Sequence, residues 1–269
     1  VRRKQGMPEL PDVEMMRRYL VDTSLNKKIE TVDVLDNYVI KKVQVDTFES
    51  RLKGTRFQEV ERRGKFLEVF TDSRYDLAIH FGMTGYLKYV NSQEKRSKYV
   101  RTIFGFKEHD LRYVSKRKLG GLYLVEDSNF DSISTIQKMG PEPLDDEFTF
   151  EDFKSITEGR SAMTKSLLLD QSFIAGIGNV YGDEILFQAG IRPDKKISDL
   201  NQQKLHTLFE EIKHVLKTVI QHEIELQNLK QTFLTPHRHS GGKCPKCGSS
   251  LKKMKISSRT SYWCDNCQK

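Results

Sequence analysis

All four cysteines of this 269-residue chain lie near its C-terminal end, in two pairs with the spacing of metal ligands. The pairs are CPKC at 244–247 and CDNC at 264–267, and 16 residues separate them. Two Cys-x-x-Cys pairs at this spacing predict one tetrahedral Zn²⁺ bound by four thiolates. Two disulfides are the alternative, but nothing in the sequence points to an oxidising compartment. We therefore predict one structural zinc ion, held by Cys244, Cys247, Cys264 and Cys267.

The segment that carries the cysteines is strongly basic. Residues 237–269 contain eight Lys or Arg residues and a single acid, Asp265, whereas the whole chain has a formal net charge of +8. Such a concentration of positive charge indicates a polyanionic partner. The stretch between the two cysteine pairs supplies Lys252, Lys253, Lys255 and Arg259. A zinc-stapled hairpin that presents these cations is typical of nucleic-acid binding.

The elements that must position these residues differ between the two halves of the chain. From residue 28 to residue 125 the sequence reads mainly as short aromatic and β-branched runs, several with period-two alternation, such as KFLEVFT, YDLAIHF and GYLKYV. This pattern predicts an antiparallel β-sandwich or barrel. A short helix precedes it, with Val13, Met16 and Leu20 on one face.

The character of the sequence changes at MGPEPL (139–144), which predicts a linker, and helical patterns follow. Asn179 is predicted to be an N-cap and Gly190 the residue after the C-cap of one helix. A longer helix is expected from about Ser198, with a core-facing stripe at Leu205, Leu208, Ile212, Val215 and Val219. TPHRHSGG (235–242) links this region to the cysteine hairpin. No run approaches the roughly 18 apolar residues of a membrane helix.

The residues Pro8 and Glu9, in MPELPDVE, allow two interpretations. A proline followed by acids is ordinary chemistry for a helix start, where the helix dipole favours negative charge. An N-terminal proline beside a carboxylate is instead a secondary amine beside a proton donor and acceptor. The local sequence cannot separate the two interpretations.

The longer motifs resemble one family. PELPDVE (8–14), RRGKFL (62–67), GPEPL (140–144) and LLLDQ…AGIGNVYGDEILFQAGI (167–191) are similar to formamidopyrimidine-DNA glycosylases, and the cysteine hairpin fits as well. The resemblance implies an α+β multidomain fold with an N-terminal β-sandwich, a helix-two-turns-helix domain and a C-terminal zinc finger. The implied domains are a catalytic β-sandwich domain at 8–138, a helix-two-turns-helix domain at 139–236 and the zinc finger at 237–269.

The resemblance implies a bifunctional glycosylase and lyase of base-excision repair that removes oxidised purines. Pro8 would be the nucleophile that forms a Schiff base, and Glu9 the general acid and base. Lys65, Asn179 and Arg259 match phosphate contacts of the family. The partner would be double-stranded DNA that contains oxidised bases or abasic sites, and the protein is expected to be a cytoplasmic monomer.

The family fills the gap left by a flipped nucleotide with Met, Arg and Phe. Met83 and Arg117 match the first two, whereas Leu119 occupies the third position. Thr84 and an apparently short segment between Ile224 and Cys244 are further departures, so the preferred lesion and opposite base stay open. Oxidised pyrimidines, the substrates of the related endonuclease VIII branch, are the alternative.

Residues 1–7 are the main objection to an active enzyme. With them attached, the Pro8 nitrogen is a tertiary amide without a nucleophilic lone pair. We expect Met7 to be the true start, reached from an upstream alternative start codon in the given sequence, and residues 1–7 to be absent from the mature protein. If they are retained, the alternative is a catalytically silent protein that binds damaged DNA. A zinc-ribbon accessory factor is disfavoured, because the resemblance extends through the β domain.

Overall fold

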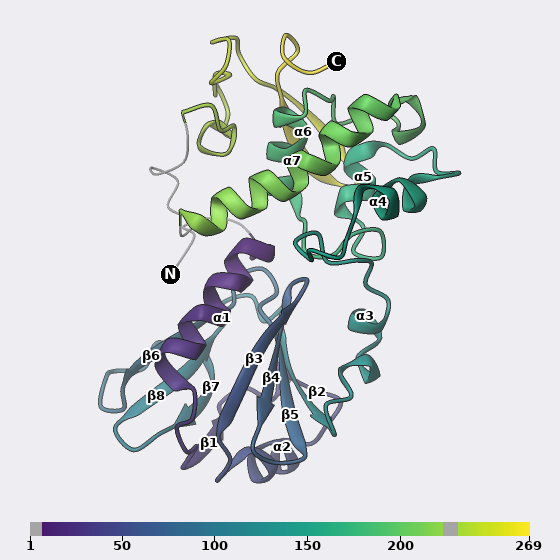
Figure 1. Cartoon of the computed structure of the whole chain (residues 1–269). Helices are drawn as coiled ribbons and strands as arrows, with labels where there is room; N and C mark the ends of the chain where they lie inside the picture. The colour runs from purple at the N-terminus through teal and green to yellow at the C-terminus, as the bar shows by residue number, and fades with distance from the viewer. Residues whose placement is uncertain (1–6, 223–230) are drawn as a thin grey trace. The chain divides into compact units, whose positions relative to one another are not determined.

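The computed structural model describes residues 7–222 and 231–269, and its contacts divide the chain into two units (Figure 1). The first unit contains Met7 and Pro8 together with residues 12–137. The second unit contains residues 9–11 and 138–269. The chain therefore passes between the units directly after Pro8, so that Glu9 belongs to the unit that carries the cysteines.

The first unit is built on two sheets. One has the order β1 (Thr31–Val34), β7 (Val100–Gly105), β8 (His109–Val114), β6 (Tyr86–Asn91), with antiparallel pairing throughout. The other has the order β2 (Ile40–Lys41), β9 (Gly121–Glu126), β5 (Tyr75–His80), β4 (Phe66–Thr71), β3 (Phe57–Arg63), and only β2 and β9 are parallel. Apolar side chains of both sheets share one buried core. The predicted β-sandwich is confirmed.

Helices complete the first unit: α1 (Leu10–Ser24), α2 (Val45–Leu52) and α3 (Ser134–Gln137), with 3-10 turns η1 (Asn37–Val39) and η2 (Phe130–Ser132). The apolar stripe predicted for the first helix is confirmed, because Val13, Met16 and Leu20 are all buried in the shared core. Helix α2 was not predicted. It contributes Phe48 and Leu52, one turn apart, to the same core.

The second unit is helical before the cysteine segment. It contains α4 (Phe150–Thr157), α5 (Thr164–Leu169), α6 (Asn179–Gln188), η3 (Ile197–Asp199), α7 (Gln202–Gln221) and η5 (Thr235–His237). The predicted stripe of α7 is buried along its whole length. The helix begins slightly later than expected, because the Asn201 side chain caps it by accepting the Lys204 N–H at 2.9 Å. Gly190, with φ +67°, follows the C-cap of α6 as predicted.

The cysteine segment forms the predicted hairpin, from β10 (Lys252–Ile256) and β11 (Arg259–Trp263). Ser257 and Ser258 connect the strands with φ values of +48° and +61°, the backbone of a two-residue hairpin turn that matches strand twist. Arg259 is thereby the first residue of β11 and is exposed to solvent. In the part of the chain that the structure describes, no helix has both the length and the apolar character needed to cross a membrane.

Candidate functional site

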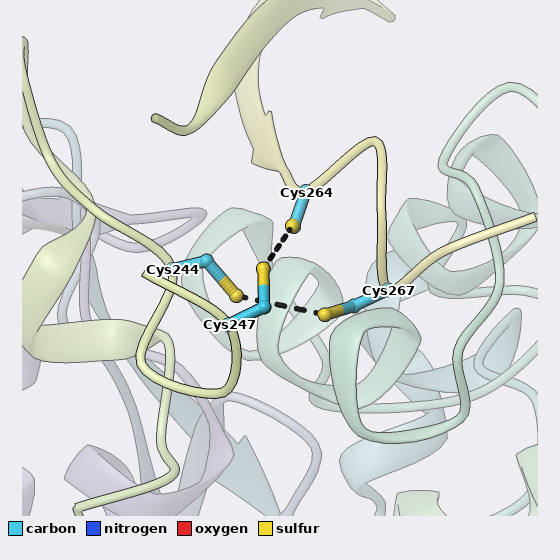
Figure 2. Close-up of side chains that lie close together, drawn as sticks. All are labelled: Cys244, Cys247, Cys264 and Cys267. Carbon is cyan, nitrogen blue, oxygen red and sulfur yellow. Dashed lines mark hydrogen bonds between the residues drawn. The ribbon is translucent and has the colours of Figure 1, made fainter. Parts of the chain in front are cut away.

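The four cysteines converge as the sequence predicted. Their sulfur atoms all lie within 4.8 Å of one another. Figure 2 shows the two shortest separations, 3.7 Å between the Sγ atoms of Cys244 and Cys267 and 3.5 Å between those of Cys247 and Cys264. Four sulfurs at about 2.3 Å from a tetrahedral zinc ion would lie about 3.8 Å apart. The donor set and its dimensions therefore fit one structural zinc ion without rearrangement.

The surroundings of the cysteines support this role. Cys244 and Cys264 are buried and pack against Phe187 of α6 and Leu234, in a small apolar cluster. The hydroxyl and backbone of Ser249 hydrogen-bond to the Cys247 sulfur and lower the pKa of that thiol to about 6, which favours the thiolate form that binds metal. Since the cluster is small, the metal takes the place of a larger core in stabilising the hairpin.

We expect zinc removal to unfold the hairpin, because structural zinc sites contribute about 10–16 kcal/mol of apparent binding free energy. Trp263, the only tryptophan of the chain, precedes Cys264 and is 4% exposed, so it reports the event. Chelation should release one zinc ion per chain and shift the Trp263 emission to the red. Cys264→Ser should lose the metal and His239→Ala should retain it. Unchanged emission after complete metal removal would contradict a structural role.

Glu9 is held at the N-terminus of α6. Its carboxylate accepts backbone N–H groups from Gly178 at 3.0 Å, Val180 at 2.8 Å and Tyr181 at 3.1 Å, and the residue is 1% exposed. The first N–H groups of a helix have no partner within the helix, and the helix dipole is positive there. The anion is therefore fixed by three donors and the positive end of the dipole.

The predicted N-cap role of Asn179 is wrong, and Glu9 explains why. The N-cap residue of α6 is Gly178, which has no capping side chain, and Asn179 is the first residue of the helix. The carboxylate of Glu9 already occupies the donors that a local cap would satisfy. The Asn179 side chain instead donates to the Thr260 carbonyl at 3.0 Å, which ties the start of α6 to strand β11 beside Arg259.

Gly178 is the residue that allows Glu9 to approach α6. A Cβ atom at this position would lie 2.7 Å from Oε1 of Glu9 and still closer to its carboxyl carbon. We expect Gly178→Ala to displace the carboxylate, at a cost of about 1–3 kcal/mol in the free energy of unfolding. A displacement of about 1 Å at a reacting group can cost about 100-fold in rate.

The matched control for this substitution is Gly182→Ala, in the same helix. A Cβ atom there would meet its nearest neighbour, Lys165, at 3.7 Å, which is ordinary contact. Removing a glycine from a helix interior should stabilise the protein by about 0.5–1 kcal/mol. Single-turnover excision rates and thermal unfolding of both variants test the expectation. Equal rates for the two alanine variants would show that the position of Glu9 does not matter.

Asp183 connects α6 to the hairpin. It is fully buried and pairs with Lys165 of α5, accepts two N–H groups of Arg238 at 2.9 and 2.7 Å, and accepts the Tyr262 N–H at 3.0 Å. A buried carboxylate with this many donors is fully compensated. The network fixes β11, and with it the strand that begins at Arg259, against the helix that holds Glu9.

In the first unit, Lys65 lies in the turn between β3 and β4. It is only 9% exposed, so the expectation of a solvated turn lysine is wrong. His80 of β5 lies opposite Phe66, and the two rings stack with centroids 4.6 Å apart. Burial, together with the nearby charge of Lys65, lowers the pKa of His80 to about 4. The imidazole is therefore neutral at neutral pH, and Lys65 supplies the positive charge there.

The structure brings Met83, Arg117 and Leu119 together in two packed loops of the first unit. A Cβ atom at Gly82, where φ is +59°, would lie 2.6 Å from the Leu119 carbonyl oxygen, so the loops approach as closely as glycine permits. The Arg117 N–H donates to Oγ1 of Thr84 at 3.0 Å. Leu119 is 51% exposed, Arg117 is exposed and Met83 is half-buried. These side chains can therefore meet a ligand together.

The predicted site residues thus fall into two groups, one in each unit. The first unit carries Pro8, Lys65 and the two packed loops, and the second unit carries Glu9, Asn179, Arg259 and the cysteines. Sequence reasoning missed Gly178, Asp183 and His80. The HFGMTG motif that contains Met83 also contains His80 and could have drawn attention to it. No local pattern marks the partners of Asp183.

Three family models match the chain in order. The formamidopyrimidine-DNA glycosylase N-terminal domain matches residues 7–122, the H2TH domain of the same glycosylase matches residues 139–230, and a zinc finger found in FPG and IleRS matches residues 241–269. The last match agrees with the geometry of the four cysteines and identifies the hairpin as a zinc finger.

Similar proteins support the same assignment. The chain is 35% identical to the formamidopyrimidine-DNA glycosylase of Pelotomaculum thermopropionicum and 36% identical to that of Protochlamydia amoebophila, over 98% of this chain and 99% and 100% of those proteins. The solved complex of Lactococcus lactis Fpg with DNA containing N7-benzyl-Fapy-dG superposes with a TM-score of 0.86 at 28% identity, and covers 97% of this chain and 99% of that chain. The chain therefore belongs to the formamidopyrimidine-DNA glycosylase family of DNA-repair enzymes.

Proposed function

We propose that this glycosylase removes oxidised purines from double-stranded DNA, formamidopyrimidines above all, and then cuts the strand. The observation that carries the proposal is the placement of Glu9. Its carboxylate is fixed by three backbone N–H groups, and its neighbour in the chain is Pro8. A secondary amine and a fixed carboxylate at consecutive positions are the two groups that this chemistry requires.

Pro8 acts as the nucleophile when it is the first residue. An α-amino group has a pKa near 7.7–8.0, so a useful fraction is neutral at physiological pH, whereas a lysine amine near 10.4 is almost fully protonated. The nitrogen lone pair attacks C1′ of the sugar, and the damaged base leaves with the electrons of the glycosidic bond. The resulting iminium acidifies the 2′ hydrogen. Its loss expels the 3′ phosphate by β-elimination, and δ-elimination then releases the 5′ phosphate.

Glu9 acts as the general acid and base. It protonates the ring oxygen of the sugar as the ring opens, and it moves the protons of the later eliminations. The three N–H donors hold its carboxylate in one orientation, which limits the motion that would otherwise be lost on reaching the transition state.

We assign phosphate binding to Lys65, Asn179 and Arg259. Lys65 provides a buried cation, and Asn179 lies at a helix N-terminus, where backbone N–H groups favour anions. Arg259 is exposed on the hairpin, and its planar guanidinium suits bidentate phosphate contact. Met83, Arg117 and Leu119, defined here as the wedge, fill the space left by the flipped nucleotide.

The same proposal covers the limits of the domains. We assign the catalytic β-sandwich domain to residues 8–138, the helix-two-turns-helix domain to 139–236 and the zinc finger to 237–269, in a protein that acts as a monomer. Residues 1–7 are absent from the active form, because only a free Pro8 nitrogen is nucleophilic. The start of the N-terminal family match at Met7 supports this assignment. Residues 1–6, and residues 223–230 of the segment that looks short, lie outside the described residues.

Substrate range is tested by single-turnover excision from duplexes that contain formamidopyrimidine, 8-oxoguanine or dihydrouracil. We expect formamidopyrimidine to be removed at least about tenfold faster than dihydrouracil, the difference that one net hydrogen bond supplies. Lactococcus lactis Fpg has been solved both with Fapy-dG DNA and with DNA containing an oxidised pyrimidine, which keeps the second class in view. Faster excision of dihydrouracil would favour the endonuclease VIII alternative.

A further inference from the structure

Two loops of the first unit form one connected surface next to the wedge. One loop joins β6 to β7 and the other joins β8 to β9. The Ser115 N–H donates to the Tyr99 carbonyl at 2.9 Å, and Nε of Arg101 donates to the Ser115 carbonyl at 2.8 Å. Because Arg117 and Leu119 follow Ser115 in the chain, the first loop is held at a fixed position beside the wedge.

The acids near these loops are already paired. Glu94 forms an ion pair with Lys88 at 2.5 Å. Asp36 lies between Lys118, at 2.6 Å, and Arg101, at 3.2 Å. These pairs leave the remaining cations of the two loops without a neutralising partner.

Arg112 gives the β6–β7 loop its shape. It is 2% exposed, pairs with Asp110 at 2.8 Å and donates to the Glu94 carbonyl at 2.9 Å. The Glu94 N–H in turn donates to the Asn91 carbonyl at 2.9 Å. A buried arginine bonded to the loop backbone orders its first half, so the cations that follow are presented from a defined platform.

The exposed residues on this platform, defined here as the basic rim, are Lys95, Arg96, Lys98, Tyr99 and Lys116. The Nζ atoms of Lys98 and Lys116 lie 5.4 and 5.9 Å from the centroid of the Tyr99 ring, so one aromatic ring supports a cation from each loop. Within residues 7–222 and 231–269, none of the four rim cations forms an ion pair with an acid. The rim is therefore a strip of four uncompensated charges.

We infer that the basic rim binds phosphates of the duplex on the flank of the wedge and extends the DNA footprint of the enzyme beyond the lesion. The inference rests on the proposed function for one point only, namely that the wedge enters the duplex. Lys116 adjoins Arg117 in the chain, so DNA that accepts the wedge presents its next phosphates to the rim. The contacts are independent of base sequence, because they involve only cations and the phosphate backbone.

Salt dependence of binding tests the inference. Each neutralised phosphate contributes about 0.9 to the slope of log affinity against log salt concentration. We expect the triple variant Lys95→Gln, Arg96→Gln, Lys98→Gln to lower that slope by about 2.7, and Lys116→Gln alone to lower it by about 0.9. Fluorescence anisotropy of the full chain, titrated with a fluorescent 25-base-pair duplex between 50 and 300 mM KCl, measures both.

The matched control is the triple variant Lys27→Gln, Lys28→Gln, Lys107→Gln, which removes the same charge from exposed positions at the opposite end of the four-stranded sheet. Its slope should equal that of the parent. Equal slopes for both triple variants would overturn the inference, as would a loss confined to duplexes with a lesion. Binding to an undamaged duplex needs neither Pro8 nor excision, so failure of the proposed chemistry would leave this measurement intact.

Discussion

Protein that begins at Pro8 is expected to form a covalent complex with abasic-site DNA in the presence of borohydride, and protein that retains residues 1–7 is expected to form none. The reason is the state of one nitrogen. As the first residue, Pro8 has a secondary amine whose lone pair can attack an aldehyde carbon, and borohydride reduces the resulting iminium to a stable amine. With Met7 attached, the same nitrogen is an amide, whose lone pair is delocalised into the carbonyl.

The control uses one preparation. A protease site placed after Met7 allows residues 1–7 to be removed from the same sample, and trapping should appear only after cleavage. Mass spectrometry of the N-terminus of protein isolated from its source would show which form occurs naturally. Equal trapping before and after cleavage would sink the assignment of Pro8 and point to another amine, whereas no trapping in either form would favour the silent DNA-binding alternative.

Glu9→Gln should lower the rate of base excision by about 100-fold to 10,000-fold, the usual contribution of a positioned general acid. The substitution keeps the size of the side chain but removes the transferable proton. It also turns an amide NH₂ toward backbone N–H groups that now donate to the carboxylate, so a loss of about 1–3 kcal/mol of stability is expected as well. Single-turnover excision and thermal unfolding measure the two effects separately.

Binding to abasic-site DNA distinguishes the catalytic role of Glu9 from a structural one. A catalytic role predicts lost excision with affinity preserved, because the acid acts on the sugar and not on the phosphates. If excision and affinity fall together, Glu9 serves only to anchor α6. Asp22→Asn, which changes the charge equally at an exposed position of α1, should match the parent in both assays. Undiminished excision by Glu9→Gln would rule out the acid role.

Features with a local cause could be predicted from the sequence. The spacing of the two Cys-x-x-Cys pairs fixed the zinc ligands, because each pair lies on a short turn and needs only a hairpin to meet the other. The stripes of α1 and α7 were predicted correctly, since burial of one helix face imposes a period of 3.6 residues. Helix α2 was missed because its eight residues are too few for that period to stand out among strands.

Tertiary contacts decided the details of the candidate site. Glu9 lies 169 residues before Gly178 in the chain, yet it caps α6, and for that reason Asn179 is free of the cap role that local propensity predicted. Likewise, the burial of Lys65 follows from the sheet that surrounds its turn, not from the turn itself. The amino-acid sequence by itself determined the family, the metal ligands and the principal elements. Only the tertiary structure decided which helix end receives the carboxylate of Glu9, because that depends on donors supplied by a distant segment and not on neighbours in the chain.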